Sequence, residues 1–235
     1  MGKRMVSVIL PAYNEGAVLR SNVEKLEGML QGILDDFEII ISEDGSTDGT
    51  GDIAKSMENG RIRVLRNERR LGKGAAIRKA AGQSKGQIVI FMDADLASNP
   101  SHVKELVGLM EGGADIVIGS RYLRESRAKR NAVRFVASKG FNWLVRTALG
   151  SKLSDHQCGF KAFRKERVLP VIEEVEDEKW FWDTELLVRA QKRGLVIREI
   201  PIEWKEARGS KFRLLRDTAN MGISLARFKL KNIRG

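Results

Sequence analysis

Apolar and polar residues alternate in blocks along the chain, and the blocks follow two different spacings. Short continuous apolar runs bounded by turn residues predict buried strands, and apolar residues at helical spacing between them predict helices. The strands are expected at 5–10, 37–42, 61–66, 87–92 and 115–119, and the helices at 17–31, 49–58, 72–84 and 100–111. This alternation favours an α/β fold, a mostly parallel sheet flanked by helices on both faces.

Polar clusters follow four of these strands. The segment Pro11-Ala12-Tyr13-Asn14-Glu15 follows the first strand, residues 43–49 follow the second, Asp93-Ala94-Asp95 the fourth and Ser120-Arg121-Tyr122 the fifth. Ligands of parallel sheets bind at the carboxyl ends of the strands. The four loops are therefore expected to line one crevice.

Asp93 and Asp95 give this crevice its most specific chemistry. Two carboxylates separated by one residue can approach the same Mg²⁺ or Mn²⁺ ion, which keeps coordination sites free for phosphate oxygens. The pattern also occurs in ordinary turns, because Asp is a common turn former. Together with the other loops, it indicates a metal site formed by Asp93 and Asp95 for a phosphoester ligand.

Two other phosphate-binding motifs are absent. A dinucleotide-binding fold needs a Gly-rich turn after the first strand, and residues 11–15 contain no glycine. The segment Gly72-Lys73-Gly74 departs from a phosphate loop, because Gly follows the Lys and Asn67 stands where the first Gly is required. For Lys73 the sequence favours a closely packed helix start and leaves open a reach into the crevice.

These motifs together resemble the inverting family 2 glycosyltransferases of the GT-A fold, over about residues 6–230. Within that family the chain is similar to the polyprenyl-phosphate hexose synthases. Three segments look closest to the dolichyl-phosphate beta-glucosyltransferases: residues 155–161, 180–187 and 204–211. The mannosyltransferases of this group usually carry Gln where this chain has Ala97, which weakens the case for GDP-mannose.

The resemblance implies roles for individual residues. It places Pro11, Ala12, Tyr13, Glu15 and Asp44 around the base and ribose of a nucleotide-sugar, most simply UDP-glucose. It places Asp93 and Asp95 at the ribose, the diphosphate and its metal. Donor and acceptor phosphates would bind Arg121, Arg134, Ser138, Arg208 and Lys211, of which Arg121, Arg208 and Lys211 would act in catalysis with the Asp pair.

The organisation expected from this resemblance is a single domain over residues 1–235. Residues 1–122 would form the nucleotide-sugar-binding half, and residues 123–235 the acceptor-binding half. No linker or repeat divides the chain, and its one cysteine, Cys158, excludes an intramolecular disulfide. Residues 1–5 leave no room for a signal peptide, and no apolar stretch approaches the ~18 residues of a membrane span. We therefore expect a cytoplasmic protein.

The net charge of +11 is concentrated in two segments. Residues 121–150 hold eight Lys or Arg and one acidic residue, and residues 205–235 hold nine and two. Apolar residues at helical spacing interleave with these charges, as in helices at an anionic membrane interface, although such stripes often pack on a core. We expect a basic amphipathic C-terminal helix and peripheral binding to the cytoplasmic face of a membrane. No nucleic-acid-binding motif accompanies the charge, so nucleic acid is not an expected partner.

The acceptor determines which residues the chemistry needs. A polyprenyl phosphate is already ionised near neutral pH and needs no general base, which fits the lack of a catalytic histidine. An acceptor hydroxyl would need a carboxylate base, and Asp155, Asp183 and Glu185 are the candidates. A nucleotide-sugar-binding or membrane-surface module without catalysis is a third reading, and the complete Asp93 and Asp95 pair argues against it.

Overall fold

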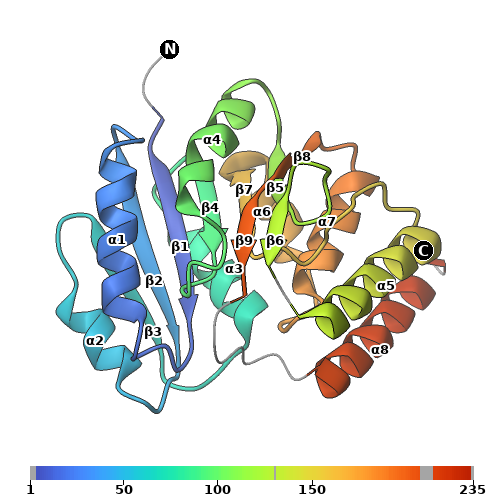
Figure 1. The fold of residues 1–235 in the computed structure, drawn as a ribbon, viewed down its shortest axis with the longest axis horizontal. Helices are drawn as coiled ribbons and strands as arrows, with labels where there is room; N and C mark the ends of the chain where they lie inside the picture. The colour runs from blue at the N-terminus through green and yellow to red at the C-terminus, as the bar shows by residue number, and fades with distance from the viewer. Residues whose placement is uncertain (1–3, 130, 207–213, 234–235) are drawn as a thin grey trace.

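The protein folds around a seven-stranded, mostly parallel sheet with helices on both faces (Figure 1). The computed structural model describes residues 4–129, 131–206 and 214–233. The sheet has the strand order β3-β2-β1-β4-β7-β5-β8. Its strands are β1 (Val6–Ala12), β2 (Phe37–Asp44), β3 (Ile62–Asn67), β4 (Ile88–Met92), β5 (Ile116–Ser120), β7 (Phe160–Arg164) and β8 (Ile197–Pro201). The predicted α/β fold class is confirmed.

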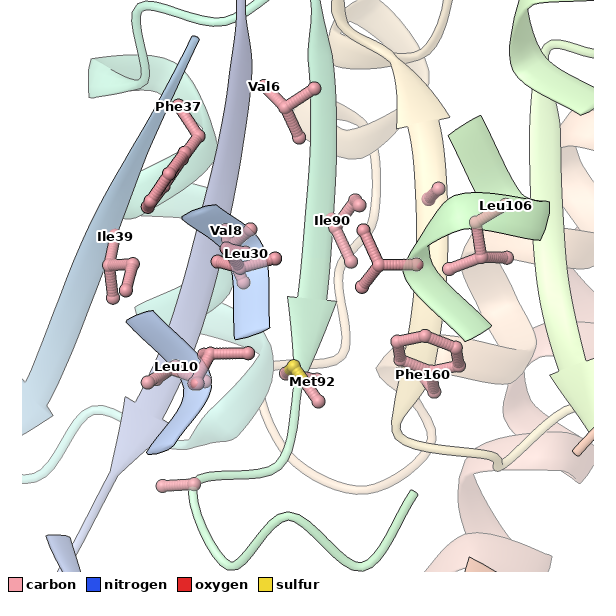
Figure 2. Packing of buried hydrophobic residues seen from close by; sticks show 14 of the residues in the cluster. Val6, Val8, Leu10, Leu30, Phe37, Ile39, Ile90, Met92, Leu106 and Phe160 are labelled. Atoms are coloured by element: carbon pink, nitrogen blue, oxygen red, sulfur yellow. The ribbon is translucent and has the colours of Figure 1, made fainter. Parts of the chain in front are cut away.

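The strands pair in the registers that their apolar runs require. All of β4 and β5 is buried, as is all of β2, because helices cover both faces of the sheet. Side chains of alternate residues project to opposite faces, so Val6, Val8 and Leu10 of β1 enter one core layer while Ile9 enters the other (Figure 2).

Two helical layers complete the core. One face of the sheet packs against α1 (Leu19–Gln31), α2 (Thr50–Ser56) and α4 (Val103–Glu111), the last preceded by a short 3₁₀ turn, Pro100–His102. The other face packs against α3 (Lys73–Gln83), α6 (Lys165–Glu173) and α7 (Trp182–Lys192). Leu19, Val23, Leu26 and Leu30 form the buried stripe of α1, with the spacing of an amphipathic helix.

One strand runs against the others. β7 lies antiparallel between β4 and β5, with Met92 paired to Phe160, and the sequence pattern did not predict it. Its start therefore lies beside the end of β4, at the edge of the sheet where the polar loops gather. A second, two-stranded sheet joins β6 (Arg127–Lys129) to β9 (Glu203–Lys205) near the same edge.

The last helices form a smaller cluster beside the sheet. α5 (Ala132–Leu149) packs next to α8 (Leu214–Ile233), as Figure 1 shows. Met221, Leu225 and Phe228 of α8 are buried with residues of α5 and α7. The apolar stripe of this C-terminal segment is therefore partly core packing, while Ile223 and Leu230 remain exposed. Among the described residues, no helix is both long enough and apolar enough to cross a bilayer.

Candidate active site

The predicted carboxylate pair lies at the carboxyl end of β4. The Asp93 amide donates to the Gly159 carbonyl at 3.1 Å, which ties the pair to the residue before β7. A side chain at position 159 would place its Cβ 2.0 Å from Asp93 Oδ2, so only glycine fits there. On the other carboxylate, Asp95 Oδ1 accepts the Ala97 amide at 3.0 Å. Both carboxylates are only partly exposed.

Lys73 completes this cluster from the first turn of α3. Its Nζ lies 2.6 Å from Asp93 Oδ1, with the side chain 18 % exposed. The neighbouring glycines explain how the turn comes so close, because a Cβ at Gly72 would lie 2.4 Å from the Glu178 carbonyl and one at Gly74 would lie 2.4 Å from Trp182. The sequence favoured the packing role and left open a reach toward the Asp pair, and the structure shows both.

The electrostatics of this cluster favour a divalent cation. Burial, the Asp93 charge and the Glu15 charge together raise the pKa of Asp95 to about 6. Burial opposes the charge of Lys73, but Asp93 and Asp183 more than offset it and raise its pKa. A surplus of carboxylate charge around Asp95 is what a bound Mg²⁺ or Mn²⁺ would relieve. Within the described residues, no group of three or more acidic, His or Cys side chains is placed to hold a metal ion.

The loop after β1 lies near this cluster, since the charge of Glu15 acts on Asp95, and it is hydrogen-bonded to the loop after β2. Pro11 and Ala12 end β1, and the Glu15 amide donates to Thr50 Oγ1 at 2.8 Å. The guanidinium of Arg70 stacks on the ring of Tyr13, 3.9 Å from its centroid. Arg70 was not predicted from the sequence, because nothing in its local pattern marks it and the stack forms between distant loops.

Asp44 is buried at the end of β2, where it holds the loop that precedes α3. Its Oδ1 accepts the Leu71 amide at 2.8 Å and the Asn67 side-chain amide at 3.1 Å. Its Oδ2 accepts the Gly72 amide at 2.9 Å. Asp44 therefore organises the backbone around Lys73, and its nucleotide contact stays a prediction.

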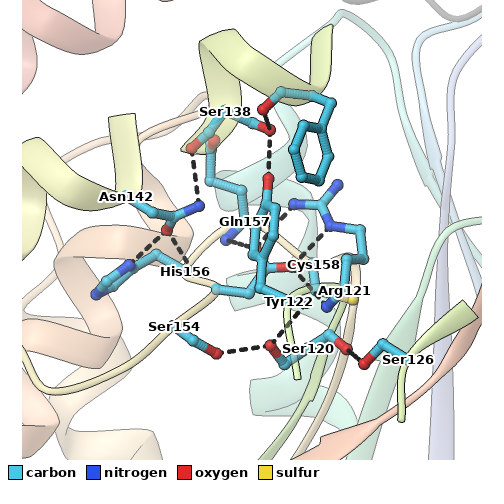
Figure 3. Close-up of polar contacts among 12 residues, drawn as sticks. Ser120, Arg121, Tyr122, Ser126, Ser138, Asn142, Ser154, His156, Gln157 and Cys158 are labelled. Carbon is cyan, nitrogen blue, oxygen red and sulfur yellow. Dashed lines mark hydrogen bonds and ion pairs between the residues drawn. The ribbon is translucent and has the colours of Figure 1, made fainter. Parts of the chain in front are cut away.

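Arg121, after β5, is held by a buried carboxylate (Figure 3). Its Nε and Nη2 donate to the two oxygens of Asp155 at 2.7 and 2.8 Å, and its own amide donates to Asp155 Oδ2 at 3.1 Å. Burial disfavours the Asp155 charge, but Arg121 outweighs it and lowers the pKa of Asp155. The arginine side chain is only 8 % exposed, and its Nη1 is not used by Asp155.

Two of the remaining predicted phosphate ligands, Arg134 and Ser138, lie on α5. Arg134 pairs with Glu206 at 2.6 Å, and the Ser138 hydroxyl bonds to the Tyr122 hydroxyl. Arg208 and Lys211 lie outside the described residues. Their roles in phosphate binding stay predictions.

The three candidate bases all have partners that stabilise their charge. Asp155 pairs with Arg121, and Asp183 lies 2.7 Å from the buried ammonium of Lys161. Glu185 lies 2.7 Å from Arg189 Nη2 and accepts the backbone amides of residues 176 and 177. All three are buried, so none of them is exposed to an acceptor alcohol.

Most of these site residues lie in a stretch of the chain that matches a known sequence family. The Glycosyl transferase family 2 model matches residues 7–169, which include the loops after β1, β2, β4 and β5 and extend past Asp155. This match covers most of the chain and contains the carboxylate pair. The chain belongs to glycosyltransferase family 2. The predicted family and its enzyme class are thereby confirmed.

Curated relatives of this family 2 glycosyltransferase include lipid-directed enzymes. It is 42% identical to Glycosyltransferase AglD of Haloferax volcanii over 229 residues, 94% of this chain but 36% of AglD. It is 31% identical to the Dolichyl-phosphate beta-glucosyltransferase of Dictyostelium discoideum and to that of Saccharomyces cerevisiae. Each alignment with these two covers 98% of this chain and 75% of the relative. The chain thus spans about a third of AglD and three quarters of the other two.

Solved structures confirm the GT-A fold. Glucosyl-3-phosphoglycerate synthase from Mycobacterium tuberculosis, in complex with Mn²⁺, UDP and glucosyl-3-phosphoglycerate, matches with a TM-score of 0.74 and 24% identity. That match covers 96% of this family 2 glycosyltransferase and 80% of the other chain. The UDP complex of the same enzyme matches with a TM-score of 0.70 and 25% identity, over 97% and 79% of the two chains.

Proposed function

We propose that this glycosyltransferase moves a hexose, most simply glucose from UDP-glucose, onto a dolichyl or other polyprenyl phosphate. Attack from the face opposite the leaving group would invert an α-linked donor to a β-linked lipid phosphate-sugar. The names of the Dictyostelium and yeast relatives support this donor and acceptor. The UDP and Mn²⁺ or Mg²⁺ complexes of the structural neighbour support a metal-assisted nucleotide-sugar site.

The proposal rests on the burial and the ion pairing of Asp155, Asp183 and Glu185. Each carboxylate is buried and paired with a cation, so none of the three is exposed to receive an acceptor hydroxyl. An acceptor hydroxyl would have to lose its proton to a group of this kind. A phosphate oxygen carries its negative charge before it arrives, so this arrangement suits a phosphate acceptor.

On the donor side, the chain's own charges suit a departing diphosphate. Asp93 and Asp95 would hold the Mg²⁺ or Mn²⁺, which when bound would offset the charge that develops on the leaving nucleotide. Lys73 adds a fixed positive charge beside Asp93. Tyr13, Glu15 and Asp44 would orient the nucleotide, and these preorganised groups would favour departure without rearranging.

A matched pair of acceptors tests this proposal. The protein is incubated with Mn²⁺, labelled UDP-glucose and either a short polyprenyl phosphate or the polyprenol of the same chain length, with GDP-mannose as a competing donor. We expect glucose on the phosphate, with a β-linkage by NMR, and none on the alcohol. Glucosylated polyprenol alongside an inert polyprenyl phosphate would refute the choice of acceptor, and preferred use of GDP-mannose would refute the donor.

We further propose that α5 and α8 present the protein to an anionic membrane surface. Val133, Val136 and Trp143 of α5 are 63%, 68% and 59% exposed, and Lys139 and Arg146 are exposed on the same helix. On α8, exposed Ile223 and Leu230 accompany exposed Arg227 and Lys229. Each Lys or Arg near an anionic surface contributes about 1 kcal/mol.

Sedimentation with anionic liposomes tests the membrane proposal. We expect binding at low ionic strength, release by salt, and weaker binding when Val136 and Trp143 are both replaced by Ser. A protein that stays in the supernatant even at low salt would show that these exposed side chains do not bind lipid.

A further inference from the structure

Helix α5 directs two polar side chains toward the loops that hold Arg121. Ser138 and Asn142 lie one turn apart on its inner side (Figure 3). The Ser138 hydroxyl bonds to the hydroxyl of Tyr122, the residue after Arg121. Asn142 bonds to His156, the residue after Asp155. Both ends of the Arg121 and Asp155 ion pair are therefore tied to the same helix.

The hydrogen bonds of Asn142 determine its orientation. Its Nδ2 donates to the Ser138 carbonyl at 2.9 Å, so its Oδ1 faces His156. That oxygen accepts the His156 backbone amide at 2.9 Å and lies 2.7 Å from the ring Nδ1. Because Oδ1 can only accept, Nδ1 must carry a proton. Asn142 thus fixes both the backbone and the ring tautomer of His156.

The imidazole is suited to a structural link. Burial, which outweighs the nearby Asp155 charge, lowers the pKa of His156 to about 4, so the ring is neutral at pH 7. Its other nitrogen, Nε2, lies 2.7 Å from the Ser151 hydroxyl. A buried ring whose Nδ1–H is held by Asn142 and whose Nε2 lies against Ser151 cannot rotate without losing these contacts.

The segment 154–156 is also held from its other side. Glu199 of β8 accepts the Ser154 amide at 3.0 Å and the Asp155 amide at 3.3 Å. Asn142 holds the next amide, that of His156. The Asp155 side chain thus projects from a backbone fixed by a strand on one side and by α5 on the other. The position of the Arg121 guanidinium depends on both contacts.

We propose that Asn142 is a positioning residue, which links α5 through His156 and Asp155 to the Arg121 guanidinium and so orients that group toward the leaving diphosphate or the accepting phosphate. The inference rests on the proposed function, in which Arg121 meets a phosphate. It assigns the inner side of α5 to the reaction, while the outer side carries the exposed apolar and basic residues. Small displacements of an aligned group cost large factors in rate.

A double-mutant cycle tests the link. Asn142→Ala and Arg121→Lys are measured singly and together, because Lys keeps a charge for Asp155 but loses the planar fork. We expect Asn142→Ala to lower kcat/KM for transfer to polyprenyl phosphate by about tenfold to a hundredfold. In the Arg121→Lys background the same change should cost less than about twofold, because the group it positions is gone.

Thr147→Ala is the matched control on the same helix. Among the residues that the structure describes, the Thr147 hydroxyl bonds only carbonyls of its own helix, so its loss should leave kcat/KM unchanged. Imidazole ¹⁵N NMR gives a readout without activity, since the chain has two histidines and His102→Gln identifies the other signal. Asn142→Ala should remove the fixed Nδ1–H form of His156.

Three results would overturn the proposal. Equal losses from Asn142→Ala in both backgrounds would show that it acts on the fold and not through Arg121. An unchanged His156 tautomer in Asn142→Ala would show that Asn142 does not fix the imidazole, which is the first step of the proposal. Wild-type kinetics of Arg121→Lys would refute the phosphate role of Arg121 and with it this inference. The acceptor specificity of the unmodified protein tests the proposed function separately.

Discussion

Replacing Asp95 by Asn should stabilise the metal-free protein while it abolishes transfer. Burial and the charges of Asp93 and Glu15 disfavour ionisation of Asp95, so the folded state carries an unfavourable charge at neutral pH. The amide of Asn has the same shape and can still accept the Ala97 hydrogen bond, but it carries no charge. The electrostatic cost of the ionised Asp95 in the metal-free protein should therefore be measurable, as a lower stability of the wild type than of Asp95→Asn.

The size of the effect follows from the pKa of Asp95. The pKa is raised from 3.8 to about 6, and each pKa unit corresponds to about 1.4 kcal/mol. Because Asp95 is partly exposed, we take about 2 kcal/mol of the resulting ~3 kcal/mol as the gain, or roughly 4–8 °C in Tm. A carboxyl group whose pKa is raised in the folded state destabilises the fold only at pH values at which it is ionised. The gain should be complete above about pH 6 and absent below about pH 4.

Thermal unfolding in EDTA at pH 8 and at pH 4 measures this difference. Asp36→Asn, an exposed carboxylate between α1 and β2, is the control and should change Tm little. Adding Mn²⁺ at pH 8 should raise the Tm of the wild type more than that of Asp95→Asn. If Asp95→Asn is no more stable than the wild type at pH 8, the electrostatic reasoning about this cluster is wrong. Retained transfer activity would refute the metal assignment.

Three further changes have defined outcomes. On acidification from about pH 6.5 to 4, His156 should contribute a loss of roughly 3 kcal/mol of urea-measured stability, because burial first, then Lys161 and Arg146, lower its pKa to about 4; the loss is read as the wild-type change minus that of His156→Gln, since Asp95 gains stability equally in both proteins. Gly159→Ala should abolish transfer by displacing Asp93, whereas Gly108→Ala, with no atom near its added Cβ, should not; equal activities would contradict the contact. Arg208→Ala should lower kcat/KM about a hundredfold if it meets developing charge, and unchanged kinetics would make it a surface charge.

The sequence by itself determined the first half of the fold. The strands β1 to β5 begin and end within two residues of their predicted bounds, because a strand buried on both faces needs a continuous apolar run. The crevice was also foreseeable, since polar loops after parallel strands gather at one edge of the sheet. The pair Asp93 and Asp95 could be recognised from its spacing and from the apolar strand that precedes it. The motifs also predicted the family, which the match over residues 7–169 confirms.

Only the tertiary structure decided how the charges in the crevice are partnered. β7 enters antiparallel between β4 and β5, and no local pattern specifies a neighbour that is distant in sequence. That strand brings Gly159 against Asp93, and it follows the segment that presents Asp155 to Arg121. Lys73 reaches Asp93 because two glycines let α3 pack closely on other segments. Charge, burial and pKa depend on such long-range contacts, which spacing along the chain does not encode.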